Sequence, residues 1–518
     1  MTLLNKNYDP QFSAGLWSDF KSDAAPLFID GNNVKFDAGR VTPSPAQLLF
    51  AKVGSGEITA LWSQLVFGIK TVFFQIGLDV FEFRAGVITK RFTALRSPVR
   101  FASFGNFTLL ADGGVLAVKK LENGDFVRIV DGPISEFVAV YSPFVLSFGD
   151  RGFRWCSADD VDVWNPDPGN SARALPIRDM DGDIVSVEKA FNGFLVGSLK
   201  YQWQVSYIGA PLWFGVRQLT GIDVGAYSEN AVCQANNMVY GFGPKGFWRL
   251  DGYSYQLLDR PQMKETIYKS FTDSSKLMLA NDVANSRVLI IFDDNEGVRR
   301  SIVWDYQYNN FSRTSENFTC VDRGGAYDTL LFGDRAGKIF SNSVVPVPPI
   351  RNAGIGLKFE KTLKIHYGFG VGGFGNLGFG YDLKTFTAPV TSATSILVTV
   401  IRPGSTNQQR PGVSGIDNDV FLETRDMDFG TGFEKYFDVV VFKISQPDAG
   451  QFYFSFATKD RIQDEILWAP ERLVFPDQPC YIRETKRYIR IKLRNVGAVE
   501  RWQMNAIEYY GEVVGGRF

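Results

Sequence analysis

Between residues 58 and 341, short apolar strands alternate with turns that centre on glycine, and this theme recurs seven times. In the clearest copies, an aromatic residue precedes the turn and a second apolar strand follows it; these copies are residues 148–155, 242–249 and 332–339. A hairpin that returns about every 40–50 residues is typical of radial β-repeats, most often of a propeller. The pattern therefore predicts an all-β fold that contains a β-propeller of six to seven blades.

The repeats divide the chain into blade-like units, and the last unit is short. The predicted units are residues 59–92, 99–130, 137–177, 184–214, 232–258, 277–312 and 320–341. The first shows four strands, whereas the last offers about three. A propeller must close its ring, and residues 26–50 hold short apolar strands between the turn signals Asp30-Gly31-Asn32-Asn33 and Asp37-Ala38-Gly39-Arg40. We predict that the propeller covers residues 26–345 and that the 26–50 segment completes its ring.

A different pattern follows the propeller. Pro346-Val347-Pro348-Pro349 favours an extended linker, because proline cannot donate to a strand ladder. A Gly/Phe-rich stretch completes a linker region over residues 346–386. From residue 387 onward, alternating strands such as 488–494 indicate half-buried antiparallel sheets. We predict a C-terminal β-sandwich over residues 387–518 and an N-terminal arm over residues 1–25.

Composition agrees with this picture and excludes some classes of protein. Hydrophobic residues make up 45% of the chain, and the high counts of Phe (45) and Gly (51) suit many short strands joined by tight turns. The formal net charge of −1 argues against a strongly basic nucleic-acid binder, although not against a protein past which DNA slides. The four cysteines are far apart and form no zinc or redox motif. No apolar run is long enough for a membrane span.

Motifs for catalysis are scarce. His366 is the only histidine, which removes Ser-His-Asp triads and histidine-based metal sites. Residues 370–375 match a dinucleotide fingerprint in their letters, but no βαβ unit surrounds them. A Gly/Phe contact loop that presents Phe369, Phe374 and Phe379 to a partner is the better interpretation. We expect no catalytic residue, no cofactor and no metal.

Two acidic segments have both a chemical and a structural interpretation. Residues 179–183 resemble a calcium loop but lack the closing Glu of an EF-hand, so an inter-strand turn is favoured. Asp159, Asp160 and Asp162 could supply paired carboxylates for glycoside hydrolysis. The repeated Asp turns of sialidase-like propellers are missing, and a surface loop is favoured.

One basic cluster has functional potential. Arg490, Lys492 and Arg494 alternate along one predicted strand and therefore share one of its faces. Such charges often protect a solvated edge strand. The alternative is a positive stripe that faces DNA or an acidic neighbouring subunit, so these three residues are candidates for a DNA channel or a subunit interface.

Several of these segments resemble the tail nozzle and packaged-DNA stabilisation proteins of short-tailed bacteriophages. The first is the start at 27–40, with its Asn32-Asn33-Val34 and Gly39-Arg40. The others are residues 154–158 with the Asp162-Val163-Trp164-Asn165-Pro166 turn, 303–306, 331–334, 421–424 before Asp426, 488–490 and 515–517. The resemblance runs from about residue 26 to the end, and the Gly/Phe insertion at 368–380 departs from it.

The resemblance implies a structural protein of the virion that is made in the host cytoplasm. Six copies would form a ring at the distal end of a short tail, retain the packaged double-stranded DNA and conduct it during ejection. Its partners would be other copies of itself, the phage adaptor and further tail proteins, and it would contact DNA without sequence recognition. The alternative is a glycan-binding propeller or glycosidase with an accessory β-sandwich, and composition alone gives only a large all-β protein without obvious catalytic machinery.

Overall fold

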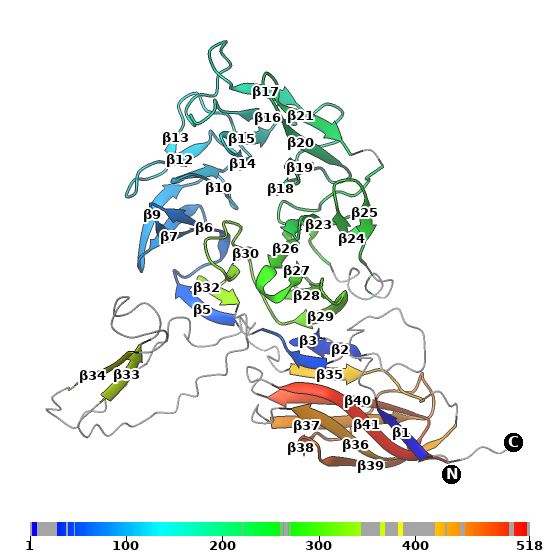
Figure 1. Cartoon of the computed structure of the whole chain (residues 1–518). Coiled ribbons are helices and arrows are strands. Elements are labelled where there is room, and N and C mark those ends of the chain that lie inside the picture. Colours follow the sequence, from blue (N-terminus) through cyan, green and yellow to red (C-terminus); the bar gives the residue numbers. More distant parts are fainter. Residues whose placement is uncertain are drawn as a thin grey trace. The chain divides into compact units, whose positions relative to one another are not determined.

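The fold is described from a computed structural model (Figure 1). The described residues are 3–7, 28–37, 40–45, 47–219, 221–259, 263, 268, 271–342, 363–367, 382–386, 420–429, 433–445, 451–496 and 502–514. Contacts divide the chain into two units, residues 1–348 with 408–518 and residues 349–407. Within the described residues, no helix is long and apolar enough to cross a membrane.

In the described part of the chain, seven four-stranded antiparallel sheets follow one another and form the blades of a propeller. Figure 1 shows them around a common centre, which β6, β10, β14, β18, β26 and β30 face. The strands of the first four blades are β6 (Ile58–Val66), β7 (Ile69–Ile76), β8 (Asp79–Arg84), β9 (Val87–Thr93), β10 (Arg100–Phe104), β11 (Phe107–Ala111), β12 (Ala117–Lys119), β13 (Val127–Arg128), β14 (Phe137–Tyr141), β15 (Phe144–Gly149), β16 (Gly152–Trp155), β17 (Arg173–Pro176), β18 (Ser186–Ala190), β19 (Gly193–Gly197), β20 (Gln202–Gly209) and β21 (Trp213–Gln218).

The remaining three blades continue the same order. Their strands are β22 (Val232–Ala235), β23 (Met238–Gly243), β24 (Gly246–Leu250), β25 (Tyr255–Leu257), β26 (Met278–Asp282), β27 (Arg287–Asp293), β28 (Arg299–Asp305), β29 (Asn310–Thr314), β30 (Cys320–Val321), β31 (Leu331–Gly333) and β32 (Lys338–Asn342), with β5 (Gln47–Lys52) as the last strand. The short 3-10 helices η3 (Ser274–Lys276) and η4 (Val283–Asn285) flank β26. Each blade lies where the repeats predict it, and the all-β fold class of propeller and sandwich is confirmed.

Aromatic side chains fill the space between blades, which explains the high phenylalanine content. Between the third and fourth blades, the ring centroids of Phe144 and Phe214 are 5.5 Å apart and those of Phe148 and Phe194 are 5.9 Å apart. Trp155 joins the same cluster, with its ring 5.2 Å from that of Phe214. Large flat side chains bury much area at little cost in conformational entropy, so they suit the wide interfaces between twisted sheets.

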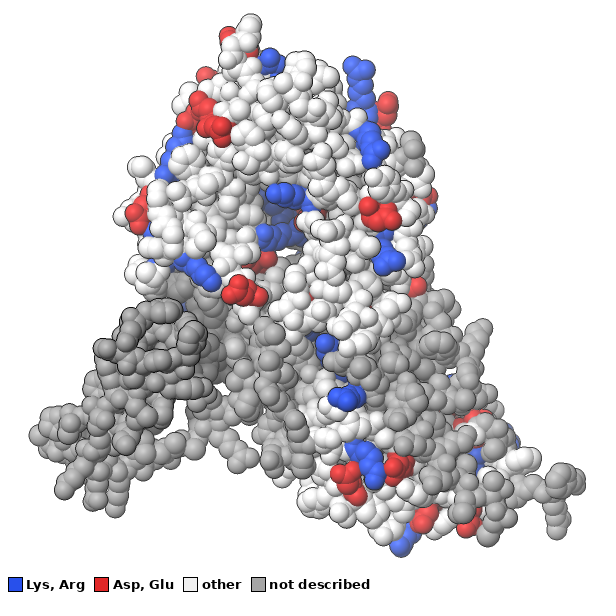
Figure 2. Space-filling view, in the orientation of Figure 1, with Lys and Arg blue, Asp and Glu red and all other residues white. Residues whose placement is uncertain are grey.

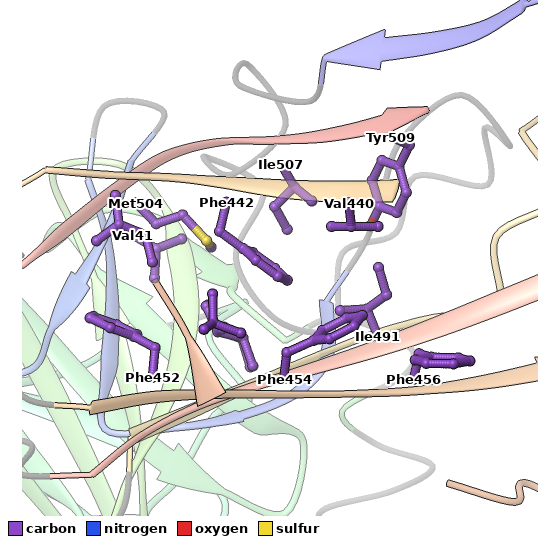
Figure 3. Packing of buried hydrophobic residues seen from close by; sticks show 14 of the residues in the cluster. Val41, Val440, Phe442, Phe452, Phe454, Phe456, Ile491, Met504, Ile507 and Tyr509 are labelled. Carbon is purple, nitrogen blue, oxygen red and sulfur yellow. The ribbon is translucent and has the colours of Figure 1, made fainter. Parts of the chain in front are cut away.

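Two further sheets pack face to face into a β-sandwich. One has the order β3 (Val34–Asp37), β4 (Arg40–Pro43), β41 (Gln503–Val513), β36 (Lys435–Ser445), β39 (Pro479–Lys486), and β1 (Leu3–Asn7) also pairs with β41. The other has the order β2 (Phe28–Asn32), β35 (Val420–Thr424), β40 (Tyr488–Val496), β37 (Gln451–Lys459), β38 (Arg472–Val474). Figure 3 shows their buried side chains, such as Phe442 and Phe454, pointing toward one another.

The strands β2 to β5 correct the prediction for residues 26–50. Only β5 completes the last blade, where it pairs with β32. β2, β3 and β4 belong to the sandwich, and Val34, Phe36 and Val41 are fully buried in its core. Apolar and polar residues alternate in the strands of blades and of sandwiches alike. This alternation alone therefore could not tell whether these strands belong to the propeller or to the sandwich. The propeller strands are therefore inserted between two parts of the sandwich.

Asn33 joins the sandwich to the outer strand of the sixth blade. Its backbone N–H donates to the carbonyl of Arg313 at 2.8 Å. Its side-chain oxygen accepts hydrogen bonds from the N–H of Ser315 at 2.9 Å and from the Ser315 hydroxyl at 3.0 Å. Nearby, the Asn310 amide donates to the carbonyl of Phe36 at 3.0 Å. The φ of Asn33 is 58°, a left-handed conformation that asparagine tolerates better than most residues.

The second unit contains β33 (Leu363–Tyr367) and β34 (Asp382–Phe386), which pair as an antiparallel hairpin. The register places Tyr367 opposite Asp382. Phe369, Phe374 and Phe379 belong to the sequence between these two strands and lie outside the described residues.

The joint at Asn33 leads to a prediction. Asn33→Gly keeps the left-handed backbone but removes two hydrogen bonds, and it should lower the free energy of unfolding by about 2 kcal/mol. Asn33→Ala should cost about 1 kcal/mol more, because alanine is strained at this φ. Urea unfolding followed by tryptophan fluorescence measures both. Asn237→Ala is the control: Asn237 is exposed with a φ of 60°, so it reports the strain alone. Equal losses for Asn33→Ala and Asn237→Ala would show that the joint contributes nothing.

Candidate functional site

The outer face of the second sandwich sheet holds the three basic residues predicted from the sequence. In β40, Ile489, Ile491 and Leu493 point into the core with exposures of 0, 1 and 4%, so the residues between them occupy the opposite face. The register places Tyr453 and Phe421 on either side of Arg494. We call this surface the cation–aromatic face, made up of Phe421, Glu423, Tyr453, Arg490, Lys492 and Arg494.

Arg490 is held by carboxylates of its own chain. Its Nε and Nη2 atoms donate to the two oxygens of Asp426 at 3.0 and 3.2 Å, and Nη1 donates to Glu423 at 3.2 Å. Lys459 adds a second cation to Asp426 at 3.0 Å. The arginine side chain is only 13% exposed. The guanidinium is therefore committed to a structural network and has little freedom to bind a phosphate.

Arg494 and Lys492 contact aromatic rings on the same face. Arg494 pairs with Glu471 at 2.5 Å, and its guanidinium lies 5.1 Å from the ring centroid of Tyr453. The Lys492 ammonium lies 4.8 Å from the centroid of the Phe421 ring. Surfaces that combine arginine with tyrosine and phenylalanine are typical of protein interfaces. The arrangement favours a subunit or partner contact over a DNA-gripping stripe.

The centre of the propeller holds a second charged cluster, which the sequence analysis did not single out. The first strands of the blades contact one another in the order β30, β6, β10, β14, β18, β22, β26 and so surround the axis. Figure 2 shows basic side chains in the hollow at the middle of the propeller. We call the cluster the hub; its members are Arg100, Glu188, Glu229, Asn230 and Arg323.

The hub connects blades that are not neighbours. Arg100 of the second blade forms an ion pair with Glu229 and donates to the side chain of Asn230 at 3.0 Å, both beside the fifth blade. Arg323 follows β30 of the seventh blade and pairs with Glu188 of the fourth at 2.9 Å. It also donates to the carbonyl of Val232 at 2.7 Å. These side chains cross the middle of the ring, so they brace the propeller from within.

Burial shifts the ionisation of the hub. Desolvation raises the pKa of Glu188, and the nearby guanidinium groups of Arg323 and Arg100 only partly offset it. Desolvation also lowers the pKa of Arg100, against the attraction of Glu229. The side chains of the two ion pairs, Arg100–Glu229 and Arg323–Glu188, are 16–25% exposed. Salt therefore screens these pairs less than it screens pairs on the surface.

Beside the hub, Asp322 closes the ring between the seventh and first blades. Its carboxylate accepts from the N–H and hydroxyl of Ser63 and from the N–H of Gly324. Leu61 and Asp322 form a parallel bridge. A Cβ at Gly324 would lie 1.8 Å from the Ser63 carbonyl oxygen, so only glycine allows this close approach.

The acidic residues that the sequence suggested as candidates form turn hydrogen bonds and ion pairs within the chain. Asp160 accepts a hydrogen bond from the N–H of Asp162 in a turn, and Asp162 pairs with Lys120. In the 179–183 segment, Asp181 lies 3.4 Å from Lys200 and Asp183 lies 3.7 Å from Arg151. Within the described residues, no group of three or more His, Cys, Asp or Glu side chains could hold a metal ion.

Burial makes the described thiols poor nucleophiles. It raises the pKa of Cys156 and of Cys480 to about 11 and that of Cys320 to about 12. The pKa of Cys233 is raised as well, again by burial. Because the thiolate is the reactive form, these cysteines act as packing residues near neutral pH.

No protein-family model and no curated protein matches the chain. Among solved structures, the extracellular domain of a one-component system from B. thetaiotaomicron is similar, with 10% identity and a TM-score of 0.40. The match covers 61% of this chain and 40% of that chain, so this chain spans less than half of its length.

The cation–aromatic face leads to a prediction that compares how much Arg490 and Lys492 each contribute to the free energy of unfolding. Arg490→Met should lower the free energy of unfolding by about 3 kcal/mol, because it removes the ion pairs of Arg490 with Asp426 and Glu423 in a partly buried network. Lys492→Met should cost less than about 1 kcal/mol, the size of an exposed cation–π contact. Urea unfolding of both variants provides the measurement. Equal losses would mean that Arg490 is no more committed to the fold than Lys492.

The hub leads to a second prediction. A double-mutant cycle of Glu188→Gln and Arg323→Met should give a coupling energy of about 1–2 kcal/mol at pH 7. The matched control is Asp181→Asn with Lys200→Met, whose side chains are 60 and 64% exposed and whose coupling should be close to zero. A hub coupling no larger than the control would rule out a brace.

The coupling energy between Glu188 and Arg323, and the stability of the wild type relative to Glu188→Gln, should both change with pH in a defined direction. Because the pKa of Glu188 is raised in the folded state, the folded chain takes up this proton more readily than the unfolded chain as the pH falls. The wild type should then gain stability relative to Glu188→Gln on acidification, while the coupling to Arg323 shrinks. A coupling that grows on acidification would contradict this assignment.

Proposed function

We propose that this protein is a structural component of the tail of a short-tailed bacteriophage. Six copies form a ring-shaped nozzle that retains the packaged double-stranded DNA and conducts it during ejection. The protein is made in the host cytoplasm and functions in the virion. Its partners are its own copies, the phage adaptor and other tail proteins, and DNA passes without sequence recognition and without catalysis.

The observation that carries the proposal is the place of the residues that resemble this family. The Asn32-Asn33-Val34 segment forms the joint between sandwich and propeller, where Asn33 bonds to Ser315. Asp305 of another such segment lies 3.6 Å from Lys35 at the same joint. The resemblance therefore includes residues that join the sandwich to the propeller, as expected for a protein whose role is structural.

The tryptophan motif of the third blade supports the same conclusion. Trp155 donates to the carbonyl of Ser171 at 2.8 Å, and Trp164 donates to the carbonyl of Val161 at 2.7 Å. Both side chains are almost fully buried, with exposures of 2 and 1%. The two indoles anchor the loop that carries Asp159, Asp160 and Asp162, which gives this acidic loop a structural role.

The charge distribution suits a conduit. The net charge is −1, and Arg490 and Arg494 are paired with carboxylates of their own chain. Each unpaired Lys or Arg that faces DNA would add a salt-dependent phosphate contact. Many such contacts around a ring would hold the DNA when it must slide.

Imaging of assembled particles provides the test. Electron microscopy of phage particles with a tag fused to this protein should place six copies at the distal end of the tail, around an opening wide enough for duplex DNA. The variant with Asp160→Asn and Asp162→Asn should assemble and infect normally. Monomers or twofold dimers in the particle would refute the nozzle. Glycan cleavage that this double substitution abolishes would favour the glycosidase alternative.

A further inference from the structure

A cluster of buried polar side chains lies where the sixth and seventh blades meet. We call it the closure cluster, because it includes the first residue of β5, the strand that completes the seventh blade. Asp282 ends β26, Arg287 begins β27, Asn342 ends β32, and Glu316 lies in the connection between β29 and β30. The members and their exposures are Gln47 (2%), Asp282 (0%), Arg287 (2%), Glu316 (4%) and Asn342 (2%).

Arg287 brings the two carboxylates of the cluster together. Its Nε donates to Oδ2 of Asp282 at 2.9 Å, and its Nη2 donates to Oε1 of Glu316 at 3.1 Å. Nε and Nη2 form one edge of the planar guanidinium group. Both carboxylates therefore lie side by side at the same edge of a single cation, which balances the charge of only one of them.

Two amide side chains lie beside this carboxylate pair. The Nδ2 of Asn342 donates to Oδ2 of Asp282 at 2.7 Å. Gln47 is the direct cross-strand partner of Asn342 in the ladder of β5 and β32. Directly opposite residues point to the same face of a sheet, with Cβ atoms about 5 Å apart. Gln47 thus shares the face from which Asn342 reaches Asp282.

Each of these four side chains has an oxygen that accepts no hydrogen bond within the described part of the chain. These buried oxygens are Oδ1 of Asp282, Oε2 of Glu316, Oδ1 of Asn342 and Oε1 of Gln47. By contrast, Oδ2 of Asp282 accepts three hydrogen bonds, from Asn285, Arg287 and Asn342. Buried polar atoms in folded proteins nearly always have a partner, which can be a water or an ion. The oxygens therefore indicate a bound ligand.

The charge of the cluster identifies the kind of ligand. Asp305, the cross-strand neighbour of Arg287, lies 3.6 Å from Lys35, so these two charges balance each other. Asp282, Glu316 and Arg287 then leave one negative charge in a region that is almost fully buried. Buried charges are paired or coordinate metals, because desolvation is costly. Water would satisfy the oxygens but would leave this charge without a partner.

We infer that the closure cluster binds a calcium ion through these four oxygens. Calcium takes about six to eight oxygen ligands, from carboxylates, amide carbonyls and water, in a flexible geometry. Magnesium requires a compact octahedron and gives up its water reluctantly, so it suits this mixed set less well. The ion would tie β26 to β5 and β32 and so stabilise the closed ring of blades. The inference does not depend on the proposed role in a phage tail.

Calcium titration of the full chain tests the inference. After dialysis against a chelator, about 5 mM calcium chloride should raise the midpoint of thermal unfolding by about 3 °C, because a ligand that binds only the folded state stabilises it. Magnesium chloride at the same concentration should give a smaller shift. Tryptophan fluorescence measures the midpoint, and equilibrium dialysis counts the bound calcium ions.

Two conservative variants locate the site. Glu316→Gln removes the unbalanced charge and Gln47→Met removes one amide oxygen. Both should bind one calcium ion fewer per chain and lose the calcium-dependent shift. Without calcium, Gln47→Met should unfold at or above the wild-type temperature, because it removes a buried amide whose partner is missing. A ligand role thus predicts opposite effects with and without calcium, which a purely structural role does not.

Gln202→Met is the matched control. Gln202 in the fourth blade is 0% exposed, and its side-chain oxygen and nitrogen also have no hydrogen-bond partner among the described residues. This variant should keep the bound ion and the full shift. If the shift were lost here too, the calcium response would not come from the closure cluster. A full shift in Glu316→Gln, or a wild type that binds no calcium, would equally overturn the inference.

Discussion

One short stretch of chain, residues 28–52, supplies strands to three sheets, and both large domains depend on it. β2 adds to one sandwich sheet, β3 and β4 add to the other, and β5 completes the seventh blade. These strands pair with partners that lie hundreds of residues later, such as β32 and β41. Closing contacts of such long sequence separation costs chain entropy that the pairing must repay. The propeller and sandwich are therefore coupled by covalent connection and by hydrogen bonds at Asn33.

This coupling gives the internal charges of the propeller a clear role. A ring of blades closed by one strand at its outer rim still needs contacts at its centre to resist distortion. The hub provides them, because Arg100 and Arg323 reach across the axis to the fourth and fifth blades. Asp322 then ties the first and last blades together through Ser63. Half-buried ion pairs of this kind contribute modestly to stability, but they fix the relative positions of the elements that they join.

Local pattern predicted the blades well and long-range pairing poorly. Glycine-centred turns and alternating strands gave the seven units, because hairpins are encoded within about ten residues. The prediction that β2, β3 and β4 complete the propeller was wrong. An apolar strand next to a turn has the same sequence pattern in a propeller blade and in a β-sandwich. The alternation of side chains along a strand correctly placed Arg490, Lys492 and Arg494 on one face. The carboxylate partners of the two arginines lie on other strands and loops, so the local pattern could not predict them. The hub was missed because Arg100, Glu188 and Arg323 are single charges in separate repeats.

The pairing of charge within the chain has a consequence for how a ring of such subunits would treat DNA. Arg490 and Arg494 look like a basic stripe in the sequence, yet each is bound by a carboxylate only a few ångströms away. To grip a phosphate, either guanidinium would first have to break these bonds and leave an acidic group unpaired, which costs more than one exposed phosphate contact returns. Lys492, whose described contact is the Phe421 ring, can exchange that contact for an acidic partner at small cost. On the proposed function, the same face would be inert toward passing DNA and would still bind a protein neighbour, a combination that a conduit built from identical subunits requires.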